Sequence, residues 1–356
     1  MKVPLLDLKA QYASVGSAVE AAVQRVLESG YYILGEDVAA FEGEIAARLG
    51  LAHAIGVSSG SDALLVALQA LGIGMDDEVI TSSLSFFATA GAIARLGARP
   101  VFADIDPQTF NMDPRDALRR VTPRTRAFIP VHLFGRPADV APLQATGLPI
   151  IEDAAQALDA ARVGKLGKLT TLSFFPSKNL GAAGDAGMVV TDDPALADKI
   201  RLLRAHGSRP KYVHATIGGN FRLDTLQAAI LRAKLPFLTA WNQRRRANML
   251  RYRELLKDTP LALPDDVEGN VWHHFVVRAP NRDALRKHLA EREIETEIYY
   301  PLPLHLQPCF AHLGGQEGDL PEAELASKTV LALPIHPELS EAQLAHVAGA
   351  VEEFYQ

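Results

Sequence analysis

The sequence has only one cysteine, Cys309, and this scarcity excludes several kinds of protein. A lone cysteine cannot form a disulfide within the chain, and it cannot build a cysteine-rich metal centre without a partner. A secreted scaffold stabilised by disulfides is therefore excluded. No metal is expected, and we expect a cytoplasmic protein.

Long apolar runs and an excess of positive charge are also missing. No apolar stretch is long enough to cross a bilayer, and the opening segment MKVPLLDLKAQY lacks the apolar core of a signal peptide. The chain carries 36 Lys and Arg against 42 Asp and Glu, a net charge of −6, so it has no overall basic field for nucleic acid. The locally basic run Arg244–Arg253 indicates the solvated face of a helix. Neither a membrane nor a nucleic acid is expected as a partner.

The sequence does have a regular alternation of strand-like and helix-like segments. Four short apolar runs each lead into a helical pattern, the second of them into a helix from Phe86 to Leu96; the runs are HAIGVSS, DEVITS, ARPVFADI and TRAFIPVH, and a fifth run, LPIIEDAA, follows them. Strands that are apolar throughout, separated by helices, favour a parallel sheet buried on both faces. The predicted fold class is α/β, with a mostly parallel central sheet wrapped by helices.

A length of 356 residues favours two domains. We predict a large domain at 1–245, which opens with helices at 15–29 and just before Gly50, and a small C-terminal α+β domain at 246–356. The two meet in a long helical stretch from Leu223 to about Leu256 that bends near Pro236. In the small domain, WHHFVVRA and ETEIYY have strand character, whereas RDALRKHLAE and EAQLAHVAGAVEEF are amphipathic helices.

Polar residues follow four of the predicted strands. They lie at Ser58–Asp62, Ser82–Phe86, Asp153–Gln156 and Ser173–Lys178. Ligands of open α/β sheets bind at the carboxyl ends of the strands. We therefore expect these four segments to meet at one cleft.

The segment VSSGSDAL places Gly60 and Ser61 at the start of a helix. Unpaired N–H groups and the positive end of the helix dipole favour a small anion such as a phosphate there. The alternative is a plain helix cap, with Ser61 or Asp62 closing the first turn. The spacing matches neither the P-loop nor the dinucleotide fingerprint, which disfavours a nucleoside triphosphate or NAD.

Lys178 and Asp153 are the residues with the clearest chemical potential. Lys178 stands between the aromatic run LSFFPS and a glycine-rich turn, and a desolvated lysine amine is a nucleophile towards an aldehyde. Asp153 ends a buried strand, where its carboxylate either caps a helix or pairs with a cationic ring nitrogen. Gln156 can lie on the same face and donate to an oxygen nearby. A lysine, an acid and a phosphate site together are what pyridoxal phosphate requires.

These motifs resemble the DegT/StrS-type nucleotide-sugar aminotransferases, pyridoxal-phosphate enzymes with the aspartate-aminotransferase fold, also called fold type I. The resemblance runs almost end to end, through PLLDLKAQY, YYILGEDVAAFE, VSSGSDALLVAL, DEVITSSLSFFATAGAI, PVFADIDPQTFNMDP, IEDAAQA, SFFPSKNLGAAGDAG, NFRLDTLQAAIL and YYPLPLHLQP. Two positions depart from the family pattern. Ala186 replaces a usual glycine, and Tyr299 stands where relatives often have histidine.

The resemblance implies a role for each candidate residue. Lys178 is expected to form the Schiff base and move protons, and Asp153 to pair with the pyridine nitrogen. The expected cofactor contacts are Gln156 at the ring hydroxyl, Gly60, Ser61 and Ser173 at the phosphate, Phe86 stacked on the ring, and Asn220 at the phosphate of the neighbouring subunit's cofactor. The resemblance makes Arg222 and Tyr300 candidate substrate contacts. Apart from the resemblance, His305 is a further pocket candidate, with a structural turn histidine as the alternative.

The resemblance also implies an activity and partners. Family members are homodimers with shared active sites. The expected reaction moves an amino group from glutamate onto a keto-sugar nucleotide, a 3-keto-6-deoxyhexose or a related sugar, in amino-sugar and polysaccharide biosynthesis. Two alternatives use the same cofactor: a sugar dehydratase, whose relatives have histidine in place of Lys178, and a regulatory protein without turnover.

Overall fold

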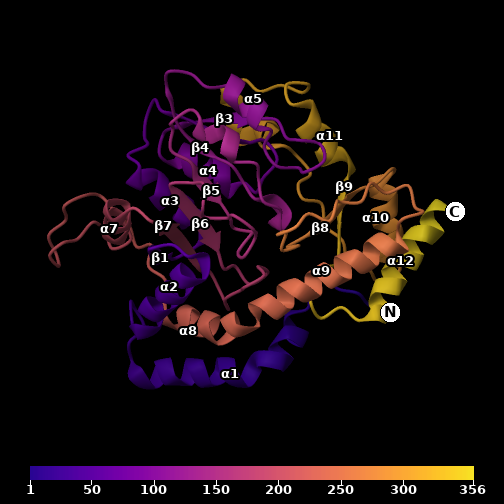
Figure 1. Cartoon of the computed structure of the whole chain (residues 1–356), viewed down its shortest axis with the longest axis horizontal. Coiled ribbons are helices and arrows are strands. Elements are labelled where there is room, and N and C mark those ends of the chain that lie inside the picture. Colours follow the sequence, from indigo (N-terminus) through magenta and orange to yellow (C-terminus); the bar gives the residue numbers. More distant parts are fainter.

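The computed structural model describes residues 1–356, and helices and strands alternate through its first half (Figure 1). From the N-terminus the elements are α1 (Leu8–Ser29), α2 (Glu36–Leu49), β1 (His53–Val57), α3 (Gly60–Ala70), β2 (Glu78–Ser82), α4 (Ala88–Arg95), β3 (Arg99–Ala103), α5 (Pro114–Arg119), β4 (Thr125–Ile129), α6 (Ala141–Gln144), β5 (Ile151–Asp153), β6 (Leu169–Ser173), β7 (Gly187–Thr191) and α7 (Pro194–Leu203).

The second half of the chain is mostly helical. Its elements are α8 (Thr225–Lys234), α9 (Leu238–Leu255), β8 (Phe275–Arg278), α10 (Arg282–Glu291), α11 (Pro321–Thr329), β9 (Val330–Leu333) and α12 (Glu341–Tyr355). Short 3₁₀ turns occur at Leu133–Gly135, Leu235–Phe237, Leu304–Leu306 and Pro308–Leu313. The 3₁₀ turn that contains Pro236 separates α8 from α9, where the sequence predicts a bend.

The strands of the first half form one mixed sheet. Strands β1, β7, β6 and β5 pair in that order, and β4, β2 and β3 continue the sheet through parallel bridges between the ends of β4 and β5. Only β7 runs against the others, since it pairs antiparallel with both β1 and β6. The carboxyl ends of β1, β2, β5 and β6 therefore lie at the same edge, as the predicted parallel sheet requires.

Helices cover both faces of this sheet, and β7 demonstrates why its strands are apolar throughout. Met188 and Val190 pack into the core shared with α1, α2 and α8, whereas Val189 packs into the core formed with α3 and α7. A strand with both faces buried needs apolar residues at successive positions.

A separate core lies in the C-terminal part, where α9, α10 and α12 pack on β8 and β9. Val3 also belongs to this core, so the N-terminus lies beside the C-terminal elements (Figure 1). Helix α9 spans the two halves and passes unbroken through residue 245, so the domain boundary at that position stays a prediction.

Three sequence expectations differ from the structure in detail. Helix α1 begins at Leu8 rather than near Val15, because the Asp7 carboxylate accepts a hydrogen bond from the Ala10 N–H at 2.9 Å and caps the helix early. Helix α4 begins at Ala88, and Phe86 precedes it in a non-helical segment. ETEIYY forms no strand; it contributes only a bridge between Glu297 and Ala332, and β9 is the partner of β8.

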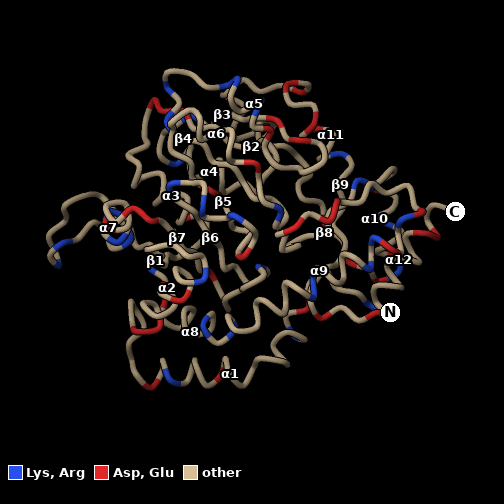
Figure 2. The backbone as a smooth tube through the Cα atoms, viewed as in Figure 1, with Lys and Arg blue, Asp and Glu red and all other residues tan.

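Charged residues of both signs are scattered over all parts of the molecule (Figure 2). No helix is both long enough and apolar enough to span a membrane.

Candidate active site

A cavity of about 490 Å³ opens at the edge of the sheet where the four strands end. All four polar segments predicted from the sequence contribute to its lining. The predicted site residues that line it are Gly60, Ser61, Phe86, Asp153, Gln156, Ser173, Lys178 and Tyr300. Asn220, Arg222 and His305 are not among its lining residues.

The start of α3 forms one end of the cavity. Ser59 is the N-cap, and its hydroxyl accepts a hydrogen bond from the Asp62 N–H at 3.0 Å, so the cap is neither Ser61 nor Asp62. The N–H groups of Gly60 and Ser61 belong to the first turn and have no partner within the helix. The cavity therefore has free donors at the positive end of a helix, an arrangement that suits a phosphate.

Three backbone segments meet closely at this end of the cavity. A Cβ atom on Gly60 would lie 2.6 Å from Ser173 Cβ, and one on Gly187 would lie 2.2 Å from the Ser59 carbonyl oxygen. The close approach of β1, β6 and β7 at this point depends on glycine. It also brings the Ser173 hydroxyl next to the start of α3.

Replacing Gly60 with alanine should weaken pyridoxal-phosphate binding by about 10- to 100-fold, because relief of the clash displaces the first turn of α3 or Ser173. Titration of the visible absorbance of the protein with the cofactor measures this affinity. Gly43→Ala is the matched control, since a Cβ on this exposed residue of α2 meets no atom within 4 Å. Equal cofactor affinity in the Gly60 variant and the wild type would contradict the assignment.

Asp153 is the last residue of β5, and its carboxylate is buried. The Thr89 hydroxyl donates to Oδ2 at 2.8 Å, and the Ala155 N–H donates to Oδ1 at 3.2 Å. Burial raises the pKa of Asp153 despite these hydrogen bonds and the nearby charge of Lys178. A buried carboxylate of this kind is stabilised by a cation, and a protonated ring nitrogen would supply one.

The neighbouring Glu152 points to the opposite side of β5 and anchors the strand end. Its carboxylate accepts hydrogen bonds from His132 Nε2 at 2.9 Å and from the Gly167 N–H at 2.6 Å. His132 is thus a buried structural residue. Because Glu152 fixes the end of β5, the position of Asp153 is fixed as well.

Lys178 lies in the bend that follows β6. Its backbone N–H donates to the Phe175 carbonyl at 2.8 Å, which holds the turn, and its side chain lines the cavity. Burial lowers the pKa of Lys178 to about 8, against an opposing contribution from the Asp153 charge. A substantial fraction of the amine is therefore neutral at physiological pH, as a nucleophile towards an aldehyde requires.

Gln156 and two aromatic residues form another wall. Gln156 Oε1 accepts the Phe134 N–H at 2.6 Å, which turns its amide NH₂ group towards the Tyr300 hydroxyl, 3.3 Å away. Gln156 is therefore oriented as a donor, as the sequence predicts. The Phe86 ring is exposed and lies 6.3 Å from the Tyr300 ring, and both residues line the cavity together with Asp153.

The remaining three predicted residues lie elsewhere. Asn220 and Arg222 belong to the segment between α7 and α8, where Asn220 forms a bridge with Ala205 and Arg222 with Val57 at the end of β1. His305 is buried, with Nδ1 2.7 Å from Ser83 Oγ and Nε2 3.2 Å from Glu324 Oε1. His305 is a structural histidine at its turn, not a side chain that lines the cavity.

Sequence patterns do not identify two cavity residues, His273 and His274. Their segment, WHHFVVRA, shows only strand character. Adjacent histidines in an apolar strand were the available signal, because a fully buried imidazole needs hydrogen-bond partners.

The residues present fit pyridoxal phosphate. Lys178 supplies an amine of lowered pKa, Asp153 supplies a buried carboxylate, and the start of α3 with Ser173 supplies phosphate donors. Phe86 supplies an exposed aromatic face. This donor set matches the aldehyde, ring nitrogen, phosphate and ring plane of the cofactor.

Comparison with known proteins agrees with this fit. The chain is 50% identical to a pleiotropic regulatory protein of Geobacillus stearothermophilus, over 100% of this chain and 99% of that protein. It is 46% identical to a dTDP-3-amino-3,4,6-trideoxy-alpha-D-glucose transaminase of Streptomyces venezuelae, over 99% of this chain and 96% of the other.

Solved structures give the same result. The crystal structure of S. venezuelae DesV in complex with a ketimine intermediate superposes with a TM-score of 0.97 and 46% identity, over 100% of this chain and 99% of that one. The predicted α/β fold, that of fold type I pyridoxal-phosphate enzymes, is confirmed by this match. The model of the DegT/DnrJ/EryC1/StrS aminotransferase family matches residues 14–352. The chain therefore belongs to this aminotransferase family.

Proposed function

We propose that the protein is a pyridoxal-phosphate-dependent aminotransferase that moves the amino group of glutamate onto carbon 3 of a keto-sugar nucleotide. The observation that carries the proposal is the meeting of Lys178 and Asp153 in one cavity with the start of α3. The names of relatives support the substrate class. The transaminase from S. venezuelae, 46% identical, is named for an amino group at carbon 3 of a dTDP-sugar.

Different residues of the chain have separate roles in this reaction. Pyridoxal phosphate, when bound, supplies an electron-poor ring that stabilises negative charge on the substrate carbon. Asp153 holds the proton on the ring nitrogen, and Thr89 and the Ala155 N–H keep its carboxylate in place. Lys178 Nζ takes the proton from the substrate carbon when the amino donor reacts, and it delivers a proton to the substrate carbon when the keto sugar is aminated. The Gln156 amide donates to an oxygen of the bound ring, and the start of α3 with Ser173 holds the phosphate.

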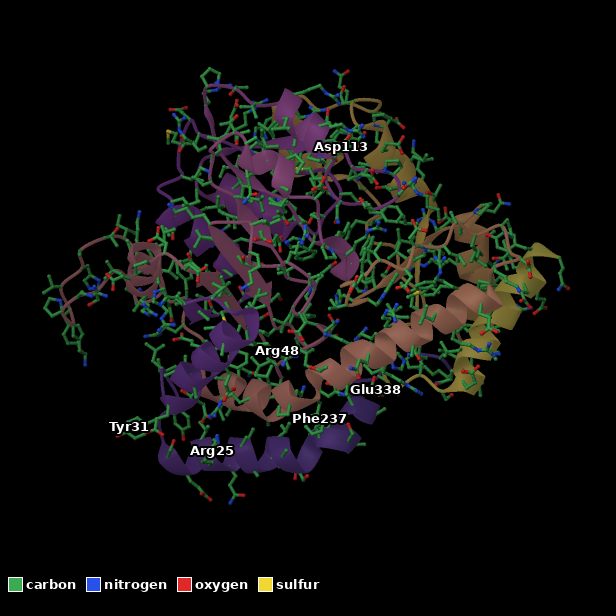
Figure 3. The ribbon with its side chains drawn as sticks, in the orientation of Figure 1. Arg25, Tyr31, Arg48, Asp113, Phe237 and Glu338 are labelled. Carbon is green, nitrogen blue, oxygen red and sulfur yellow. The ribbon has the colours of Figure 1, made fainter.

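We further propose that two copies of the chain share their active sites, as the resemblance implies. Exposed apolar side chains gather in the turn between α1 and α2 and in the loop before α8; they are Tyr31, Tyr32, Ile33, Leu34, Tyr212, Val213 and Ile217. Figure 3 places Tyr31 at the end of the molecule remote from the C-terminal helices. The turn meets the start of α8, since the Thr225 N–H donates to the Tyr32 carbonyl at 2.9 Å. Exposed apolar surface of this kind favours a protein interface, and it would carry Asn220 and Arg222 to the neighbouring site.

The alternatives make different predictions. A dehydratase of this type has histidine at the position of Lys178, so the lysine disfavours it. A regulatory protein without turnover is kept open by the name of the 50% identical relative from G. stearothermophilus. The same residues would bind pyridoxal phosphate in either case, so turnover is the measurement that separates an aminotransferase from a regulatory protein.

The decisive experiment incubates the purified protein, loaded with cofactor, with glutamate and a panel of keto-sugar nucleotides. We expect glutamate alone to change the visible spectrum, and a 3-keto-sugar nucleotide to yield a 3-amino sugar detected by mass spectrometry. Substrates with the keto group at carbon 4 are the matched comparison. Cofactor binding without any spectral change on adding glutamate would favour the regulatory protein and overturn the proposal.

A further inference from the structure

His273 and His274 occupy an unusual stretch of backbone immediately before β8. Neighbouring residues of a regular strand point to opposite faces, yet both of these side chains line the cavity, with ring centroids 4.0 Å apart. The chain enters this stretch through Trp272 at φ +50°, a left-handed conformation that is unfavourable for a bulky residue. Such a conformation persists only where the surroundings impose it.

Neighbouring residues hold Trp272 and His273 in this conformation. The Trp272 N–H donates to Asn270 Oδ1 at 2.8 Å, and the buried Arg245 guanidinium donates to the His273 carbonyl at 3.3 Å. Arg245 belongs to α9, so this helix contacts the stretch through the Arg245 side chain. The position of the His273 ring is therefore set by contacts on both sides of it.

The hydrogen bonds of Asn179 determine which nitrogen of His273 carries the proton. Asn179 Nδ2 donates to the Val271 carbonyl at 3.0 Å and to Asn242 Oδ1 at 2.8 Å. Because a backbone carbonyl can only accept, the orientation of the Asn179 amide is fixed and its Oδ1 faces His273 Nδ1 at 2.9 Å. An amide oxygen can only accept, so Nδ1 must donate and carries the proton.

The other nitrogen, Nε2, is then unprotonated in the neutral ring. Burial, together with His274, Lys178 and Arg245, holds the pKa of His273 well below its usual value. Nε2 has no hydrogen-bond partner in the protein, and the atom is not fully buried. Since His273 lines the cavity, the free lone pair of Nε2 is presented there.

We propose that His273 Nε2 is a substrate-binding acceptor, which takes a hydrogen bond from an ammonium or hydroxyl group of the molecule bound in the cavity. Asn179 is its positioning residue, because it fixes the tautomer. Asn179 also follows Lys178 directly, so the acceptor and the reactive amine are held by the same turn. The inference rests on the proposed function for the identity of the substrates, which are the amino donor and the sugar nucleotide.

The tautomer is measured on the cofactor-loaded protein labelled with ¹⁵N-histidine, with His273→Asn used to assign the signal. We expect an Nδ1–H tautomer between pH 6 and 9. Two unreactive probes then separate the sources of the donor group: N,N-dimethyl-L-glutamate carries a tertiary ammonium group that keeps one N–H but cannot form an imine, and dTDP-glucose carries sugar hydroxyls. The probe that is recognised should shift the Nε2 resonance upfield. An Nε2–H tautomer, an imidazolium ring, or no shift with either probe overturns the proposal.

Two variants separate recognition from a purely structural role. His273→Asn keeps an N–H for Asn179 but lacks a group at Nε2, whereas His273→Gln offers an acceptor near Nε2 and loses the bond to Asn179. We expect His273→Asn to raise KM for the recognised substrate about tenfold with a smaller change in kcat, and His273→Gln to recover part of the loss. A normal KM in His273→Asn with a defect in His273→Gln would assign a structural role instead. The tautomer and the probe shifts need no turnover, so they can fail or succeed independently of the proposed reaction.

Discussion

Replacing Lys178 with alanine should lower kcat by about 10⁴-fold or more, because the variant loses both the amine that bonds to the cofactor aldehyde and the group that moves the proton. No other lysine lines the cavity, so no second lysine amine is available there to bond to the cofactor aldehyde. The variant should still bind pyridoxal phosphate through Asp153 and the start of α3, with the visible spectrum of the free aldehyde. Absorbance spectra and the half-reaction with glutamate measure the two effects separately.

A suitable control is Lys168→Ala, which removes a half-exposed lysine that pairs with Asp193 at 3.5 Å on the surface. Its activity should remain within about twofold of the wild type. Small primary amines should restore part of the activity of Lys178→Ala, since they can enter the space left by the side chain. If the alanine variant keeps more than about a tenth of the wild-type rate, Lys178 cannot be the proton-transfer group.

The sequence predicted the sheet and its functional edge because these depend on local patterns. Apolar strands followed by helices imply parallel connections, and polar residues at strand ends such as Asp153 and Ser173 then have to meet. The reversed strand β7 was not anticipated. It follows β6 through a turn without a helix, and it brings Gly187 against Ser59.

Details that depend on the exact backbone of one turn or on long-range contacts were out of reach. Ser59 caps α3 rather than Ser61 because the backbone at Ser59 is still extended, at φ −162° and ψ 166°. His305 resembles a pocket residue in sequence, but Ser83 and Glu324, far away along the chain, occupy both of its nitrogens. His273 shows the converse, since its place in the cavity depends on Asn179 and Arg245. These partners are 94 and 28 residues away from His273 along the chain, so no local pattern around WHHFVVRA encodes the contacts.

Replacing Asp153 with asparagine should lower kcat by about 10³-fold while leaving the fold intact. Asparagine keeps the shape of the side chain but has no charge, so it cannot hold the proton on the ring nitrogen, and the ring withdraws electrons less well. Thr89→Val separates charge from hydrogen bonding, because it removes the donor 2.8 Å from Oδ2 and leaves the carboxylate. Its kcat should fall only about tenfold.

Thermal unfolding with and without cofactor also tests whether Asp153 pairs with the ring nitrogen. Burial raises the pKa of Asp153 in the folded protein, so its ionised form costs stability at pH values above that pKa when no cation compensates. Asp153→Asn should therefore raise the melting temperature of the cofactor-free protein at neutral pH. It should lower the additional stabilisation given by pyridoxal phosphate, because the charge that pairs with the ring nitrogen is gone. Equal stabilisation of the wild type and the variant by the cofactor would mean that Asp153 does not face the ring nitrogen, and the buried carboxylate would then need a different cation.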